Sequence, residues 1–298
     1  MMAEMSDMSP SPFRARSVFS FWKREPRGSR MLRASMAIAL CALVLASIPA
    51  QARDRGADGR FDRRRSSHFL LLQDADIDQR TGVNGTKRFE RDILEVLESA
   101  HDLLAESLGL RPRSDVEVRV YAANVFDAQF SRAFGFRAAG FFDGTIHVRG
   151  GTRVDPQLVR TLHHEYVHAV IHAEAGPGAF PAWLNEGLAE YFETLAIGKG
   201  GLSYGERNVL ARAVRTDVWI PLGAMSGVSF THLREGTAAL AYLEAYAVVD
   251  HLVRRGGLAA MKRFCERFIR TRNLNRALTQ TYRVNLVELE AAVLAELR

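Results

Sequence analysis

Two histidines and one glutamate stand at a spacing that suits a metal site. Residues 164–168 read His-Glu-Tyr-Val-His. On a helix, His164 and His168 lie one turn apart on the same face, so both imidazoles can bind one zinc ion. Glu165 follows the first histidine, and its carboxylate can reach a water in the fourth coordination position and take its proton. These residues predict a zinc site in which Glu165 is the general base of a hydrolysis.

Zinc needs a third protein ligand, and the chain supplies candidates shortly after the motif. Residues 181–190 read PAWLNEGLAE and predict a second helix that starts with a proline at its first position. Glu186 is the best third ligand. Glu190 lies one turn further along the same face, and we expect it to accept a hydrogen bond from the other ring nitrogen of a ligand histidine. Glu193 continues the row and is expected to be a solvated or capping carboxylate.

Two neighbouring histidines are expected to lie outside the metal site. His172 stands one turn beyond His168, but three histidines in line along a straight helix cannot all bind one tetrahedral ion. His163 points away from the metal face. The metzincin form of zinc site is excluded, because it needs glycine and histidine where Ile171 and Glu174 stand.

The motif HEYVH followed by WLNEGLAEYFE resembles the gluzincin metallopeptidases, which include thermolysin and the zinc aminopeptidases. It is most similar to the small peptidase MA-like branch, strongly over 161–193 and more loosely over about 68–255. The chain has no G-A-M-E-N-like stretch, with which the aminopeptidases hold a free amino terminus. The resemblance implies one Zn²⁺ per chain with ligands His164, His168 and Glu186, general base Glu165, and Glu190 as partner of a ligand histidine.

The same resemblance extends to a possible oxyanion donor. Residues 242–252, YLEAYAVVDHL, are similar to a helix of the same branch. In gluzincins a Tyr or His from the helical lobe often binds the oxyanion, a contact that contributes about 2–4 kcal/mol. Tyr242 is the better-aligned candidate and Tyr246 follows one turn later, while a role for both as core aromatics is equally favoured. His232 and His251 are less favoured alternatives.

The pattern of apolar residues predicts an α+β fold. Short apolar or alternating runs predict strands, and apolar residues spaced three and four apart predict helices. The predicted architecture is a small mixed sheet with the two zinc-binding helices over 66–200, followed by a helical C-terminal lobe over 201–298. The resemblance to the gluzincins implies that this arrangement is thermolysin-like. The expected strands cover 68–72, 116–121 and 145–149, and the expected helices 86–108, 124–134, 205–215, 236–254, 257–270, 273–280 and 285–297, with Asp155 and Pro156 starting the motif helix.

By resemblance, residues 140–148 are the substrate-facing edge of this sheet. The strand 145–149 precedes the motif helix, and in gluzincins the comparable strand forms the edge beside the cleft. The free backbone groups of such an edge can pair with an extended peptide or protein substrate. An ordinary sheet edge without a substrate is the alternative.

The N-terminal residues indicate export. Residues 31–52 have the charge, the apolar run and the Ala-Gln-Ala end of a secretory signal, so 1–52 are an extended n-region and signal peptide, or the chain starts at Met31. The apolar run is too short to span a membrane, and we expect no integral span after cleavage. Residues 53–65, rich in Arg, Asp and Gly, predict a basic disordered linker.

The remaining composition excludes other classes. The net charge of the whole chain is +6, but it lies in the first 65 residues, so 66–298 are nearly neutral and give no indication of nucleic-acid binding. The mature chain keeps one cysteine, Cys265, which can form no internal disulfide and is expected in the core.

These observations favour a periplasmic or secreted zinc metallopeptidase that cuts peptide bonds internally. The main alternative is a non-catalytic, metal-stabilised binding protein of the cell envelope. A third hypothesis is a zinc hydrolase that acts on a non-peptide amide.

Overall fold

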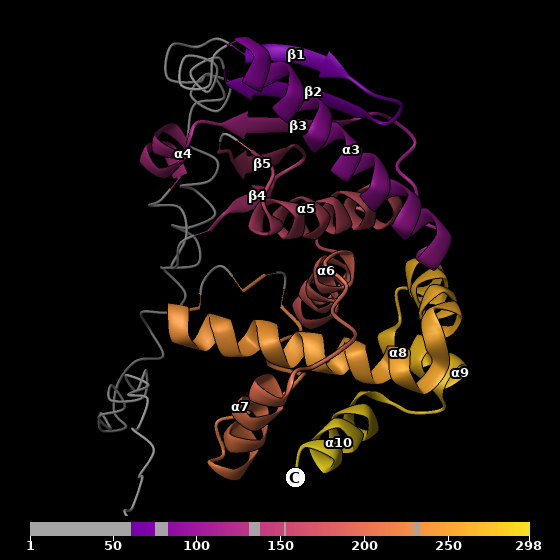
Figure 1. Cartoon of the computed structure of the whole chain (residues 1–298). Coiled ribbons are helices and arrows are strands. Elements are labelled where there is room, and N and C mark those ends of the chain that lie inside the picture. The colour runs from indigo at the N-terminus through magenta and orange to yellow at the C-terminus, as the bar shows by residue number, and fades with distance from the viewer. Residues whose placement is uncertain (1–60, 75–82, 131–137, 152, 228, 231–232) are drawn as a thin grey trace, which may run out of the picture. The chain divides into compact units, whose positions relative to one another are not determined.

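The computed structural model describes residues 61–74, 83–130, 138–151, 153–227, 229–230 and 233–298. They form a five-stranded sheet and a set of helices, so the expectation of an α+β fold is confirmed (Figure 1). All of them belong to one compact unit, Ile48–Arg298. The predicted signal peptide and the first part of the predicted linker lie outside the described residues.

The sheet is mixed, with antiparallel strands at both edges. Its order is β1-β2-β3-β5-β4, and the three inner strands run parallel to one another. Buried and half-buried side chains alternate along β2 and β3, as expected for strands with one face on the core. The strands are β1 (Phe61–Arg65), β2 (Phe69–Asp74), β3 (Val116–Tyr121), β4 (Gly140–Phe142) and β5 (Ile146–Arg149).

Strand β1 corrects the expected linker. The composition of 53–65 predicts disorder, whereas residues Phe61–Arg65 pair antiparallel with β2. Arg64 and Arg65 form ion pairs with Glu90 at 2.9 Å and with Asp115 at 3.0 Å. Charged side chains are common on edge strands, where they discourage pairing with other chains, so the arginines are compatible with a strand.

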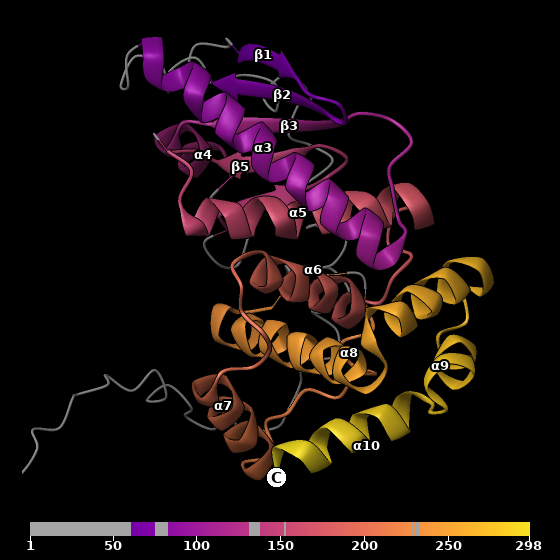
Figure 2. The same ribbon diagram turned by 45° about the vertical axis from the view of Figure 1, so that its right-hand side comes forward.

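Three helices pack on this sheet. Helix α3 (Val83–Leu108) connects β2 to β3 and packs on β2, and α5 (Pro156–Ala175) packs on β4 and β5. Figure 2 shows α3 crossing the sheet and meeting α5. The short helix α4 (Ala123–Phe130) packs on β5 and ends earlier than expected, with 131–134 outside the described residues.

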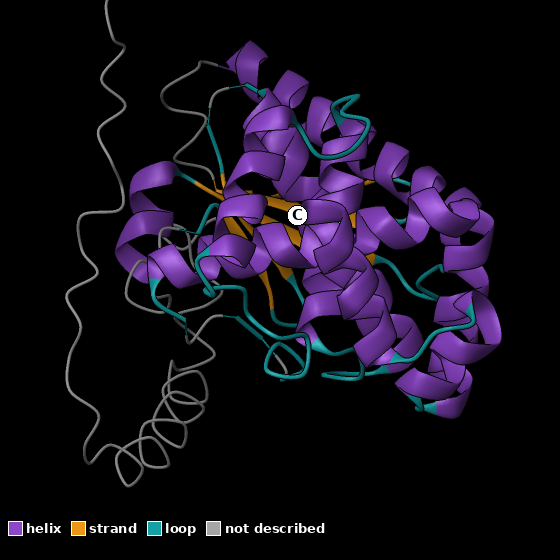
Figure 3. Ribbon diagram, turned by 90° about the horizontal axis from the view of Figure 1, so that it is seen from below, coloured by secondary structure: helices purple, strands orange, loops and turns teal. Residues whose placement is uncertain are grey.

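Helices α6 to α10 follow α5 in the chain. Helix α6 (Ala182–Ala196) lies between α5 and α8 (Glu235–Thr271) in both Figure 1 and Figure 2. Helix α8 was expected as two helices, and it contains one kink at Gly257, whose φ is 72°. Seen from below, these helices lie in front of the strands (Figure 3). The remaining helices are α7 (Tyr204–Arg215), α9 (Leu274–Tyr282) and α10 (Leu286–Leu297).

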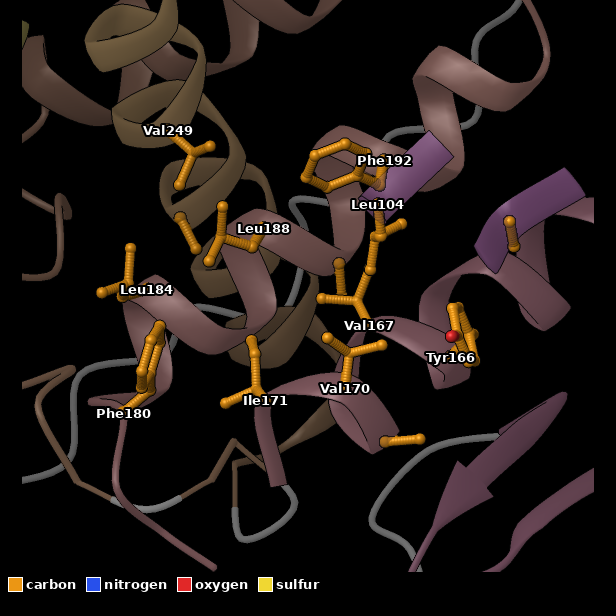
Figure 4. Close-up of a cluster of buried hydrophobic side chains, with 14 of the residues drawn as sticks. Leu104, Tyr166, Val167, Val170, Ile171, Phe180, Leu184, Leu188, Phe192 and Val249 are labelled. Atoms are coloured by element: carbon orange, nitrogen blue, oxygen red, sulfur yellow. The ribbon is translucent and has the colours of Figure 1, made fainter. Parts of the chain in front are cut away.

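The core between α5 and α6 fixes how the two predicted metal helices face each other. Leu184, Leu188 and Phe192 recur every four residues along α6 and are fully buried. Val167 and Val170 of α5 are buried in the same cluster (Figure 4). No helix among the described residues has the length and apolar character needed to cross a membrane.

Candidate metal centre

Helix α5 presents both motif histidines on one face. Asp155 caps the helix by accepting a hydrogen bond from the backbone N–H of Leu158 at 2.8 Å, and Pro156 fits the first turn. The rings of His164 and His168 have their centroids 4.9 Å apart and their planes at 82°. The one-turn spacing therefore places two imidazoles side by side, as the sequence predicted.

Helix α6 brings Glu186 to these histidines because it approaches α8 very closely. At Gly187, an added Cβ would stand 2.4 Å from the backbone oxygen of Ala245 and 2.7 Å from a methyl group of Val249. Only glycine allows the two backbones this near. The close contact sets the depth of α6 and thereby the position of the adjacent Glu186.

The three predicted ligand atoms converge. Oε2 of Glu186 lies 3.4 Å from Nε2 of His164 and 3.3 Å from Nε2 of His168. In a tetrahedral zinc site with bonds of about 2.0–2.1 Å, neighbouring ligand atoms stand about 3.3–3.4 Å apart. These distances exceed those of charge-assisted hydrogen bonds, and the buried Oε2 of Glu186 has no hydrogen-bond partner among the described residues. The donor set and its spacing fit a zinc ion.

The electrostatics of the cluster also favour a cation. Burial opposes charge on Glu186, yet the imidazoles of His168 and His164 lower its pKa to about 2. Burial likewise opposes charge on His164, but Glu186 and Glu193 raise its pKa well above the ordinary value. The pKa of His168 is raised as well, against burial, by Glu186. The carboxylates therefore make this site strongly attractive to positive charge.

The carboxylate that contacts a predicted ligand histidine is Glu193, which corrects two expectations. Oε2 of Glu193 lies 3.0 Å from Nδ1 of His164, the bond that we expected Glu190 to form. Glu193 is 6% exposed, so it is not a solvated carboxylate. Arg160 donates to its other oxygen from Nε at 2.9 Å and also from Nη2. Glu193 thus holds His164 with its Nε2 toward Glu186.

Glu190 lies beside this pair without replacing it. Carboxylate oxygens of Glu190 and Glu193 and a ring nitrogen of His164 are all within 4.8 Å of one another. Burial and the neighbouring Glu193 raise the pKa of Glu190 to about 7. Its place at the edge of the cluster is thus as predicted, but the hydrogen bond to the histidine is not.

Glu165 faces the edge strand of the sheet. It is buried, and burial raises the pKa of its carboxyl. Gly140 of β4 lies against it: an added Cβ there would be 3.2 Å from Cγ of Glu165 and 2.7 Å from Cγ2 of Thr161. The absence of a side chain at residue 140 lets the strand run directly beside the predicted base.

The order of the strands corrects the expected position of the sheet edge. The strand 145–149 was expected at the edge, whereas β5 is flanked by β3 on one side and β4 on the other. The edge is β4, which is three residues long, contains glycine and was not among the expected strands. The stretch 140–148 therefore comprises the edge strand and most of its inner neighbour.

Of the two tyrosine candidates, Tyr242 is the one near the predicted metal ligand His164. Its ring centroid is 6.3 Å from that of His164. Burial raises the pKa of its hydroxyl, and the carboxylates Glu186 and Glu165 add to the increase, so the phenol remains a donor. Tyr246 instead packs against Tyr191 and lies under Nζ of Lys199, 5.0 Å from its ring centroid.

The other histidines take structural roles. Nδ1 of His163 bonds to the backbone oxygen of Val159, and the ring of His172 contacts Phe142 of β4 at 5.3 Å. His251 bonds to Glu296 at 2.8 Å, and His232 lies outside the described residues. Sequence reasoning missed Arg160 and Gly140. Arg160 stands one turn before His164, a spacing that could have indicated it.

No protein-family model matches this chain, and no curated protein matches it either.

Proposed function

We propose that this protein is an exported zinc metallopeptidase of the gluzincin type that cuts peptide bonds internally. The observation that carries the proposal is the spacing of the three ligand atoms of His164, His168 and Glu186, 3.3–3.4 Å from Glu186 to each histidine. It is supported by the resemblance of HEYVH and WLNEGLAEYFE to that family and by the signal-like residues 31–52. A thermolysin-like arrangement of sheet and helices is part of the proposal.

The chain's own residues would divide the work as follows. A zinc ion held by His164, His168 and Glu186 would polarise the scissile carbonyl and lower the pKa of a bound water. Glu165 takes the proton of the attacking water and passes it to the leaving amine. Its raised pKa brings the carboxyl nearer to neutral pH, which suits both transfers.

Other residues would position the substrate, stabilise the charge on its carbonyl oxygen and hold a predicted ligand in place. Tyr242 keeps its proton and donates a hydrogen bond to the carbonyl oxygen as that atom gains negative charge. Edge strand β4 offers backbone groups to an extended substrate, and Gly140 holds that strand against Glu165. Glu193 and Arg160 keep the ring of His164 in place.

The decisive experiment is Glu165→Gln, with metal content and hydrolysis of a peptide library measured together. We expect about one zinc per chain in parent and variant, and hydrolysis lowered by about 10²–10⁴-fold in the variant. Glu174→Gln, the same chemical change at a half-buried position of the same helix, is the matched control and should keep full activity. Equal hydrolysis in parent and variant would rule out Glu165 as the general base. Full zinc with no hydrolysis by the parent would instead favour the metal-stabilised binding protein.

A further inference from the structure

A strongly basic stretch lies in the C-terminal third of the chain. Residues 254–283 contain nine Lys or Arg and one acid, Glu266. The compact part of the chain is nearly neutral as a whole, so its acids are concentrated elsewhere. The near-zero net charge of the compact part is therefore the sum of a basic stretch and an excess of acidic residues elsewhere.

The fold gathers part of this stretch into one surface, here called the basic face, made of Arg263, Arg267, Arg270, Arg276 and Arg283. The first three stand at i, i+4 and i+7 on α8, beyond the kink at Gly257, and so share one side of that helix. Arg276 and Arg283 are likewise seven residues apart on α9 and at its C-terminal cap.

A contact between α8 and α9 joins the two sets. Nη1 of Arg267 donates to the backbone oxygen of Gln280 at 3.1 Å and to Oγ1 of Thr281 at 2.8 Å. Helices α8 and α9 pack on each other, and they lie side by side in Figures 1 and 2. The arginines of both helices therefore belong to one continuous region.

The basic face is not neutralised by the protein. Among the described residues, no ion pair includes any of its five arginines, whereas Arg254 outside it is paired with Asp250 and Glu296. Arg263, Arg270, Arg276 and Arg283 are exposed. Arg267 has a structural role, because it binds the C-terminal end of α9. Within the described part of the chain, no such role accounts for the other four arginines of the basic face.

An exposed apolar side chain adjoins these charges. Val287, in the first turn of α10, is 76% exposed. Oδ1 of Asn275 accepts the backbone N–H of Leu286 at 2.9 Å, so the first turns of α9 and α10 lie together. Val287 follows Arg283 by four residues and lies in the turn that contacts the first turn of α9, which carries Arg276. The exposed Glu288 beside it caps α10 by accepting the backbone N–H of Asn285 at 2.8 Å. An apolar side chain at the border of a basic surface matches the boundary between headgroups and acyl chains of a membrane.

We propose that the basic face docks on the surface of an anionic phospholipid membrane. Arginine side chains bind lipid phosphates through planar, bidentate donors, and several together give reversible, salt-sensitive attachment. Val287 favours a lipid surface over a nucleic acid, because a phosphate backbone offers it no apolar contact. The proposal is independent of the proposed peptidase, because none of these residues is a predicted ligand or acts in hydrolysis.

The test places a reporter at the predicted contact in the full chain. An environment-sensitive fluorophore is attached at Val287→Cys in a Cys41→Ser background, where Cys265 is buried and escapes labelling. Vesicles of equal phosphatidylglycerol and phosphatidylcholine are compared with pure phosphatidylcholine. We expect a blue shift with the anionic vesicles only, reversed by about 1 M salt. A label at exposed Ser99→Cys on α3 should not respond, even if the basic N-terminal residues also bind.

Charge-matched variants complete the test. Replacing Arg263, Arg270, Arg276 and Arg283 together by Gln should raise the lipid concentration for half-maximal response at least about tenfold. Gln at Lys87, Arg88, Arg207 and Arg215 removes equal charge from exposed positions elsewhere and should change it little. The proposal fails if the Val287 label does not respond to anionic vesicles, or if both variants lose the response equally. It also fails if the label responds to duplex DNA and not to vesicles.

Discussion

At the scale of single residues, the orientation of His164 depends on a carboxylate and a guanidinium. Glu193 bonds to Nδ1 of the histidine, and Arg160 holds Glu193. Partners of this kind fix both the tautomer and the direction of a metal-binding ring. The affinity for zinc should therefore depend on residues that are not themselves ligands.

We expect Glu193→Ala to weaken zinc binding by about 10–100-fold, because His164 loses the group that orients it. Glu190→Ala is the matched control one turn earlier on α6 and should weaken binding less. Competition with a chromophoric chelator measures both constants. If the two variants were equally affected, net charge rather than orientation would explain the result.

The hydroxyl of Tyr242 gives a second residue-scale prediction. Tyr242→Phe should lower kcat by about 10²–10³-fold and leave zinc affinity unchanged, because the donor acts on the substrate oxygen and not on the metal. Tyr246→Phe is the control, since its ring lies against Tyr191 and Lys199. Steady-state kinetics with a cleaved peptide would distinguish them, and equal effects would remove Tyr242 from the site.

At the scale of elements, local patterns predicted the helices well but not how they meet. The cap at Asp155 and the pairing of His164 with His168 depend on residues a few positions apart, which the sequence displays directly. The choice of Glu193 over Glu190 depends on the rotation of α6 against α5. Packing sets that rotation, and the spacing of the glutamates, four and then three residues apart, gives no sign of it.

The sheet shows the same limit. The inner strands were predicted from their apolar patterns, whereas β1 and β4 were missed as strands. Both are short edge strands that bury little, so charge and glycine dominate their composition. Their pairing is a property of the neighbouring strands as much as of their own residues.

The crossing of α6 and α8 yields an element-scale prediction. Gly187→Ala should lower the free energy of unfolding by about 1–3 kcal/mol, because the methyl group would press against the backbone of Ala245. Gly236→Ala is the control, since nothing lies within 4 Å of its Cβ position. Urea denaturation of the metal-free proteins measures both. A neutral Gly187→Ala would show that the two helices can separate at no cost.

At the scale of the whole molecule, a buried acid links the C-terminal helices to the loop before them. Glu244 of α8 is fully buried and accepts the backbone N–H of Ile220 at 3.1–3.2 Å. Burial raises the pKa of its carboxyl to about 8, although that hydrogen bond partly lowers it. The folded protein therefore keeps a proton on Glu244 that the unfolded chain loses near its ordinary pKa.

Stability should accordingly fall as the pH rises. Between about pH 4.5 and 8 the folded state binds more protons at Glu244 than the unfolded state, so its contribution declines over that range and is constant above it. Glu244→Gln should be more stable than the parent at pH 8 by about 2–4 kcal/mol and nearly equal to it at pH 4.5. Urea unfolding at both pH values tests this, and parallel pH profiles would contradict it.

Because β4 is short, this sheet edge could recognise only a short segment of a bound chain. Three residues of strand extend about 10 Å, so an added strand could align only about three of its own residues there. Backbone pairing of that length recognises extended conformation and carries little information about side chains. A partner chain on this edge would therefore be selected mainly by its freedom to unfold locally, and folded proteins would be engaged at their loops and termini.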